Sequence, residues 1–199
     1  MRPAGVILAG GLARRMGGGD KCLVPLGHAP MLTHIIARLR PQVDALALNA
    51  NGDPTRFAAF NLPVLPDPLP DNPGPLAGIL AGLTFAQAQG ASHVVSVAGD
   101  TPFFPADLVA RLSAASAPIA LAATREDGTV RRHPTFGLWP VSAADDLLAA
   151  LHDGVRKVVV FADAVGAETV VFDDDDPFFN VNRPEDLEAA EARLLDEPS

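Results

Sequence analysis

The stretch Val6-Ile7-Leu8-Ala9-Gly10-Gly11 decides the fold. Four apolar residues that run into two glycines are typical of a buried strand of a parallel sheet that ends in a glycine loop. Three more glycines follow at Gly17-Gly18-Gly19, and Asp20-Lys21 close the segment. Glycines let backbone N–H groups surround phosphate oxygens, and Arg14, Arg15 and Lys21 add positive charge. We therefore predict a phosphate-binding loop directly after the first strand.

This loop matches neither of the two common phosphate-binding motifs. The P-loop requires a lysine between glycine and serine or threonine, whereas Lys21 stands between Asp20 and Cys22. The spaced three-glycine pattern of dinucleotide-binding proteins does not fit either. A surface loop with solvated charges is the alternative interpretation. Five glycines and three cations directly after the first strand favour the phosphate site.

Strand-like and helix-like segments alternate beyond this loop. We predict strands over residues 2–9, 43–48, 63–66, 93–98, 119–123, 135–139 and 168–172. We predict helices over residues 31–39, 55–60, 76–88, 106–115, 142–152 (with Ser142 as its cap) and from 184 onward, while 154–162 fits either. Gly78 and Gly82 would let the third of these helices approach its neighbours closely. The alternation predicts one α/β domain over residues 1–199, with a mostly parallel sheet and helices on both faces.

The composition excludes several classes of protein. Hydrophobic residues make up 48% of the 199, which is enough to bury a core and excludes disorder as the dominant state. No apolar run reaches the roughly 18 residues of a membrane span, and the first run is too short for a signal peptide. A single cysteine forms no intramolecular disulfide. We therefore expect a cytoplasmic protein.

The charge is unevenly distributed along the chain. The 15 Lys+Arg and 24 Asp+Glu give a formal net charge of −9, which argues against nucleic-acid binding. Residues 1–40 hold six basic residues and one acid, a net charge of +5, so residues 41–199 carry −14. The positive charge therefore gathers around the predicted phosphate loop.

Polar side chains stand at the ends of other predicted strands, where ligands bind in open parallel sheets. Asp100 follows one such strand and is suited to hold Mg²⁺, which prefers few carboxylates together with phosphates and water. A cap or turn before Thr101-Pro102 is the equal alternative for Asp100. Asp67 also stands at a strand end, and an Asp-Pro turn is its alternative interpretation.

Asn49 and Asn51 are two residues apart, so on a strand they share one face. An amide offers a donor and an acceptor together, which suits a base edge or a ribose. For Asn51, turn formation in Asn51-Gly52-Asp53 is an adequate explanation.

The segment from Leu8 to Lys21 resembles the signature of Rossmann-like nucleotidyltransferases, in the form found in molybdenum cofactor guanylyltransferases. Further segments agree with that family in its order: Asp67 with 73–78, Gly99-Asp100-Thr101-Pro102, His133-Pro134-Thr135 and Asn180-Val181-Asn182-Arg183-Pro184. The resemblance spans almost the whole chain. It implies a three-layer Rossmann-like fold, with a nucleotide-binding half over residues 1–105 and an acceptor-substrate half over residues 106–199.

The resemblance also implies which residues carry the function. Lys21, Asp100 and Arg15 would act in catalysis, with Asp100 as the ligand of Mg²⁺, the one expected cofactor. The expected binding residues are Leu8, Ala9, Gly10, Gly11, Lys21, Asn49, Asp67, Asp100, Asn180 and Asn182.

Four of the residues matched to the family have a second interpretation or no assigned role. Asn180 and Asn182 would lie near the reacting phosphates, with capping of the last helix as the alternative. Arg156 matches a basic position on the pterin side, with an ordinary surface arginine as the alternative. His133 matches a position without an assigned role. Cys22 directly follows Lys21, which could lower its pKa, but it is expected to pack, because no catalytic histidine is near it in sequence.

The implied reaction is the transfer of GMP from GTP to the terminal phosphate of molybdopterin, with release of pyrophosphate. Molybdoenzyme apo-proteins or their chaperones would be transient partners, and neither nucleic acid nor a membrane is expected. The alternatives are a molybdopterin cytidylyltransferase, a sugar-phosphate nucleotidyltransferase and a non-catalytic nucleotide-binding module. Gly10, where the cytidylyl enzymes have alanine, and the run over residues 73–78 both favour guanine.

Overall fold

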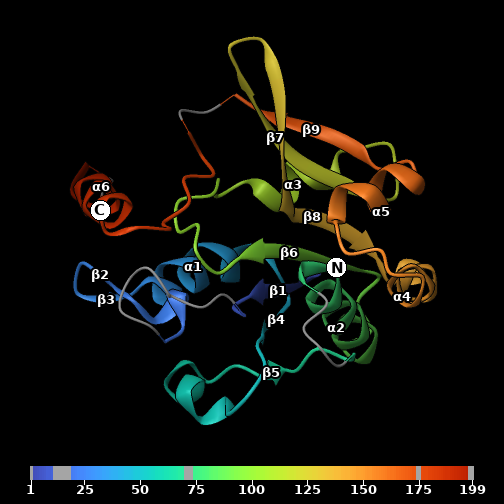
Figure 1. Cartoon of the computed structure of the whole chain (residues 1–199), viewed down its shortest axis with the longest axis horizontal. Coiled ribbons are helices and arrows are strands. Elements are labelled where there is room, and N and C mark those ends of the chain that lie inside the picture. Colours follow the sequence, from blue (N-terminus) through green and yellow to red (C-terminus); the bar gives the residue numbers. More distant parts are fainter. Residues whose placement is uncertain (1, 11–18, 70–73, 174–175, 197–199) are drawn as a thin grey trace.

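The computed structural model of this chain describes residues 2–10, 19–69, 74–173 and 176–196. Its centre is a seven-stranded sheet with the strand order β5-β4-β1-β6-β8-β7-β9 (Figure 1). The strands are β1 (Ala4–Leu8), β4 (Ala45–Asn49), β5 (Val64–Leu65), β6 (His93–Ala98), β7 (Ala120–Glu126), β8 (Thr129–Pro140) and β9 (Glu168–Phe172).

The sheet is mostly parallel, as predicted. Strand β1 pairs in parallel with β4 on one side and with β6 on the other, and β7 pairs in parallel with β9. Strand β8 runs antiparallel to both β6 and β7. Leu8 lies opposite both Asn49 and Ala98, so the carboxyl ends of the three central strands coincide.

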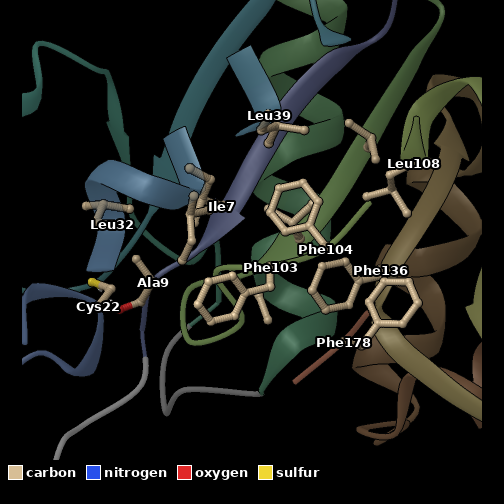
Figure 2. Close-up of a cluster of buried hydrophobic side chains, with 14 of the residues drawn as sticks. Ile7, Ala9, Cys22, Leu32, Leu39, Phe103, Phe104, Leu108, Phe136 and Phe178 are labelled. Carbon is tan, nitrogen blue, oxygen red and sulfur yellow. Dashed lines mark hydrogen bonds between the residues drawn. The ribbon is translucent and has the colours of Figure 1, made fainter. Parts of the chain in front are cut away.

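Helices cover both faces of the sheet, which confirms the α/β prediction. Side chains alternate along each strand, so Val6 and Ile7 contribute to different hydrophobic clusters. The Ile7 cluster includes residues of α1 (Met31–Leu39), α3 (Leu108–Ser113) and α6 (Pro184–Asp196), and Figure 2 shows part of it. The Val6 cluster includes residues of α2 (Pro75–Ala88), α4 (Ala144–His152) and α5 (Val158–Ala164).

Two glycines bring α2 close to the sheet, as predicted. A Cβ atom at Gly82 would lie 2.6 Å from Val6 Cγ1, and one at Gly78 would lie 2.7 Å from Leu8 Cδ2. Any side chain at these positions would push the helix away from β1. The close packing fixes the N-terminus of α2 beside the ends of the central strands.

Short elements occupy the connections. A small hairpin of β2 (Pro25–Leu26) and β3 (Ala29–Pro30) precedes α1, and α6 lies beside β2. The 3₁₀ turns are η1 (Lys21–Leu23), η2 (Arg40–Gln42), η3 (Pro54–Phe60) and η4 (Val141–Ala143). Within the described residues, no helix is both long enough and apolar enough to cross a membrane.

Several details differ from the sequence prediction. The segment over residues 55–60 belongs to the 3₁₀ turn η3, and α3 covers only Leu108–Ser113 of the helix predicted over 106–115. Ser142 is not a cap: it lies inside η4, and α4 begins at Ala144 without a side-chain hydrogen bond. Strand β8 begins at Thr129, because its first residues pair with β7 in a hairpin whose exposed side chains carry no apolar signal. The ambiguous segment over residues 154–162 contains the start of a helix, α5, whose Val158, Phe161 and Ala162 face the core.

Candidate functional site

The carboxyl ends of β1, β4 and β6 form one edge of a cavity. Backbone pairing continues one residue past the strands: Ala9 N–H donates to Asn49 O (2.9 Å), and Gly99 N–H donates to Leu8 O (3.0 Å). Ala9, Asn49 and Gly99 are thereby held side by side at the point where ligands bind in open parallel sheets.

The cavity has a volume of about 570 Å³, which is the size of a small-molecule site. Its lining comes from the strand ends and the segments that follow them, from η1, η3 and β8, from the N-terminus of α2 and from the segment before α6. The lining residues are Leu8, Ala9, Gly10, Asp20, Lys21, Cys22, Asn49, Asn51, Arg56, Asp67, Gly74, Pro75, Ala98, Gly99, Asp100, Thr135 and Asn180.

The Lys21 ammonium joins three distant parts of the chain. Lys21 Nζ lies 2.6 Å from Asp100 Oδ2 and donates to Asn180 Oδ1 (3.5 Å) and to Asn182 Oδ1. Lys21 is 8% exposed, so its charge is held by these partners rather than by solvent. The structure therefore brings together four residues that the sequence analysis assigned to phosphate and metal binding.

Backbone contacts hold the two asparagines in place. Val181 N–H, between them, donates to Asp100 O (2.9 Å). The carboxylate of Asp186 accepts from the backbone N–H groups of Asn182 (2.8 Å) and Arg183 (2.9 Å), at the start of α6. Because Asp186 caps this end and both asparagine side chains contact Lys21, the alternative that Asn180 and Asn182 serve as helix caps is wrong.

A second polar group forms around Asp67. Asn49 Nδ2 donates to Asp67 Oδ1 (2.9 Å) and to Leu65 O (3.1 Å). Asn51 Nδ2 donates to Asp67 Oδ2 (2.8 Å), and Asp67 N–H donates to Asn51 Oδ1 (2.8 Å). A turn in Asn51-Gly52-Asp53 is therefore not a sufficient explanation of Asn51, because its side chain also fixes the orientation of Asp67.

Helix α2 packs directly against the side chain of Asn49. A Cβ atom at Gly78 would lie 2.2 Å from Asn49 Oδ1, a distance that no real Cβ atom adopts. Gly74 begins the helix with φ +83°, a conformation that favours glycine, and Pro75 occupies the first turn. Gly74 and Gly78 thus shape the cavity wall next to Asn49. In the sequence they were only part of a motif that matches the family.

Two residues with no predicted role, Asp20 and Arg56, also line the cavity. Arg56 Nε lies 2.5 Å from Asp20 Oδ2, and a second guanidinium nitrogen lies 3.3 Å from Asp20 Oδ1. Asp20 and Arg56 are 36 residues apart in the sequence, so no local sequence pattern predicts their contact. Gly74, Cys22 and Thr135 are further lining residues with no assigned contact to a ligand.

Cys22 is a packing residue, as expected. Burial, reinforced by the negative charge of Asp20, raises the pKa of its thiol to about 12. Figure 2 shows Cys22 beside Ala9 at the edge of the hydrophobic cluster. A thiol with such a pKa stays protonated at neutral pH and does not act as a nucleophile.

Several predicted residues lie elsewhere or outside the described ranges. His133 stacks on Phe178 (4.4 Å between ring centroids) and shares a hydrogen bond with Thr124 Oγ1 (2.9 Å), away from the cavity lining. Burial, aided by the positive charge of Arg131, lowers the pKa of His133. Arg156 is exposed and donates to Leu151 O (2.7 Å). Gly11, Arg14 and Arg15 fall outside the residues that the structure describes.

A magnesium ion fits the donor set at Asp100. Within the described part of the chain, no three His, Cys, Asp or Glu side chains cluster to make an all-protein metal site. Asp100 instead offers one carboxylate, 24% exposed, beside the amide oxygens of Asn180 and Asn182. Mg²⁺ is usually held in this way, by one or two carboxylates, with substrate phosphates and water completing its shell.

The cavity thus has two chemically different ends. The Asp67 end offers a carboxylate oriented by two amides, which suits a base edge with N–H donors. The Lys21 end offers an ammonium, a carboxylate and two amides, which suits phosphate groups with an accompanying cation. Such an arrangement can bind a nucleotide with its base and its phosphates at opposite ends.

The chain is similar to known proteins over most of its length. A sequence profile of the MobA-like NTP transferase domain matches residues 5–165. A protein of Cereibacter sphaeroides named molybdenum cofactor guanylyltransferase is 50% identical over 194 residues, covering 98% of both chains. A protein of the same name from Mesorhizobium japonicum is 51% identical over 201 residues, covering 96% of this chain and 95% of its own.

Solved structures share the fold. Molybdopterin-guanine dinucleotide biosynthesis protein A of Archaeoglobus fulgidus superimposes with a TM-score of 0.71 at 22% identity, covering 98% of this chain and all (100%) of the other. CMP:2-keto-3-deoxy-manno-octonic acid synthetase superimposes with a TM-score of 0.73 at 13% identity, covering 100% of each chain. At these identities the likeness establishes the three-layer nucleotidyltransferase fold alone.

Proposed function

Since this chain belongs to the MobA-like NTP transferase family, we propose that it transfers GMP from GTP to molybdopterin. The terminal phosphate oxygen of molybdopterin attacks the α-phosphorus of GTP. The bond from that phosphorus to the oxygen bridging the α- and β-phosphates breaks, and pyrophosphate leaves with the electron pair. The product is the guanine dinucleotide form of the cofactor.

One observation carries this proposal: Lys21, Asp100 and Asn180 meet at one end of the cavity although they come from three distant segments. A phosphate monoester is an anion near neutral pH, so its attack requires no strong general base. The protein has to position two phosphate groups in line and to stabilise the charge that develops between them. A buried ammonium with adjoining amide groups supplies both.

Lys21 acts as a compact point charge toward the phosphates. Asn180 and Asn182 accept from Lys21 through their Oδ1 atoms, and the Nδ2 group of each amide is a separate donor that can bind a phosphate oxygen. The N–H groups of the glycine loop after β1 would add further donors. These groups hold the α-phosphate while the acceptor phosphate approaches.

Mg²⁺ is the proposed cofactor, and Asp100 is the residue that would hold it. When bound, the ion neutralises negative charge on the phosphates. Asp100 stays fixed for this task because Val181 N–H binds its carbonyl and Thr101 Oγ1 donates to its Oδ1 (3.2 Å).

Guanine selection is proposed for the Asp67 end. The N1–H and N2–H groups of guanine are adjacent donors, and a carboxylate accepts such a pair. Asn49 and Asn51 occupy one lone-pair site on each oxygen of Asp67 and leave the remaining sites for the base. Cytosine presents no matching pair of ring and exocyclic donors, so this end favours GTP over CTP.

The test is pyrophosphate release with molybdopterin and each nucleotide in turn. We expect release with GTP, little with CTP, and a loss of release with the Asp100→Ala variant. Asp107→Ala is the matched control, because Asp107 is an exposed aspartate in the same connection after β6. Release with CTP and none with GTP would contradict the guanylyl assignment, and no release with any nucleotide would favour a binding module.

The cellular setting completes the proposal. We propose that the reaction takes place in the cytoplasm and that the dinucleotide product passes to molybdoenzyme apo-proteins or to their chaperones. The acidic balance over residues 41–199 accords with such a role, because it opposes non-specific binding to nucleic acid.

A further inference from the structure

We propose that Arg56 is a positioning residue that ties the base-binding end of the cavity to its phosphate-binding end through Asp20. This inference rests on the proposed binding of a guanine nucleotide. Arg56 belongs to η3, between β4, which ends at Asn49, and β5, which Asp67 follows. Asp20 directly precedes Lys21. All five residues line the same cavity.

Arg56 makes contacts toward both ends. Its Nε and one terminal nitrogen bind the two oxygens of Asp20, at 2.5 and 3.3 Å, in a two-point pair. The same terminal nitrogen donates to Asn51 O (2.6 Å), and the other donates to Asp53 O. Arg56 therefore holds the backbone of the residue whose side chain orients Asp67.

The contacts form a continuous chain across the cavity. Asp67 binds the side chain of Asn51, the backbone of Asn51 binds Arg56, and Arg56 binds Asp20. Asp20 is then covalently joined to Lys21, whose ammonium binds Asp100. Base recognition and phosphate binding thus share one set of fixed atoms.

The number of contacts shows that Arg56 positions other groups rather than binding the nucleotide itself. A guanidinium has five N–H donors, and acceptors of the protein engage four of them. Its plane also lies over the buried ring of Phe57, 4.5 Å from the centroid, which fixes its direction. A nucleotide phosphate would have to displace Asp20 to gain a two-point contact.

Asp20 is poorly solvated, so its negative charge requires the pairing with Arg56. The side chain of Asp20 is 12% exposed, and that of Arg56 is 28% exposed. Without Arg56, a nearly buried carboxylate would stand unpaired beside the site of the phosphates, and its negative charge would repel them. Loss of Arg56 should therefore weaken phosphate binding as well as base selection.

The test is a double-mutant cycle on nucleotide affinity. The variants are Arg56→Ala, Asp20→Asn and the combination of both, with Arg56→Lys as the conservative change. The probes are GTP and inorganic pyrophosphate, measured by calorimetry, followed by KM for GTP and kcat in the transfer assay. Arg131→Ala is the control, because Arg131 forms an exposed ion pair with Glu126 on the β7–β8 hairpin.

We expect Arg56→Ala to weaken GTP and pyrophosphate binding by about tenfold or more, with a raised KM and a smaller change in kcat. Asp20→Asn in the Arg56→Ala background should recover part of the loss, because it removes the unpaired charge. Free guanidinium ion should partly restore GTP binding to Arg56→Ala and not to the wild type. Arg131→Ala should bind like the wild type.

Several outcomes would overturn the inference. These are wild-type affinity in Arg56→Ala, strictly additive losses in the cycle, or a loss of GTP binding with pyrophosphate binding unchanged. If Arg56→Ala does not fold, Arg56→Lys and Asp20→Asn carry the same test. A wild type that binds GTP but does not react with molybdopterin refutes the proposed transfer and leaves the cycle interpretable.

Discussion

The Lys21 ammonium lies 2.6 Å from the Asp100 carboxylate, so the two groups proposed to bind phosphate and metal compensate each other's charge. Asn182 shares the same ammonium. A nucleotide and a cation that bind here must therefore rearrange this contact. Because Lys21 is buried, its charge needs such partners.

Replacing Lys21 should abolish most of the transferase activity. We expect Lys21→Ala to lower kcat by about 10²–10³-fold, because the charge that develops at the reacting phosphate loses its fixed cation. The measurement is pyrophosphate release at saturating GTP. Lys157→Ala is the matched control, because Lys157 is exposed and is the one other lysine in the chain. Activity of Lys21→Ala within threefold of wild type would contradict the proposed role.

Replacing Asp67 by asparagine should change the base preference. Asparagine replaces one of the two acceptor oxygens by an NH₂ donor, so it can accept from only one of the two adjacent guanine donors, and kcat/KM for GTP should fall by roughly tenfold to a hundredfold. ITP lacks the exocyclic amino group of GTP. The ratio of kcat/KM for GTP to kcat/KM for ITP should therefore fall. The exposed Asp153→Asn serves as control. An unchanged GTP-to-ITP ratio would show that the base is selected by other groups.

A methyl group at Gly78 should damage both packing and binding. The added Cβ would meet Asn49 Oδ1 at 2.2 Å and Leu8 Cδ2 at 2.7 Å, so Gly78→Ala should destabilise the fold by about 1–3 kcal/mol. KM for GTP should rise because Asn49 is displaced. Thermal and denaturant unfolding measure the first effect. Gly10→Ala is the control for stability, since its Cβ would meet nothing within 4 Å.

Cys22 should resist alkylation in the folded protein. Its pKa of about 12, against an ordinary 9.0, leaves almost no thiolate at pH 8, and the side chain is buried. Iodoacetamide should therefore modify Cys22 much faster in denaturing urea than under native conditions. Equal rates in the two conditions would contradict the burial of this thiol.

The raised pKa of Cys22 makes the free energy of unfolding depend on pH in the alkaline range. The folded pKa of Cys22 lies above the unfolded one, so its contribution is complete below pH 9 and is lost as the pH rises toward 12. Cys22→Ala should reduce this part of the alkaline loss, as measured by urea unfolding at increasing pH. Identical pH profiles for the variant and the wild type would show that other groups cause the loss.

Elements with strong periodicity were predictable from the sequence. Helix α1 and strand β6 have the predicted bounds, because four apolar positions at helical spacing define the first and a mostly apolar run, interrupted by Ser96, defines the second. The strand-end positions of Asn49, Asp67 and Asp100 also followed from the sequence, since parallel strands place their carboxyl ends along one edge.

Long-range polar contacts were not predictable. Asn51 has an adequate local explanation in an Asn-Gly turn, and only the fold shows that its side chain pairs with Asp67, 16 residues away. Arg56 lies in a segment whose apolar pattern predicts packing and gives no indication of a contact with Asp20. The family signature includes Asp20, but a signature does not state which partner a carboxylate has.

The hydrogen bond from Val181 to Asp100 has a consequence for synthesis of the protein on the ribosome. Lys21 leaves the exit tunnel long before Asn182, which is translated 161 residues later. A nascent chain therefore has no complete phosphate end until residue 182 has left the ribosome. A product cut short by a premature stop codon before residue 180 would build most of the sheet and still lack the residues that close the site.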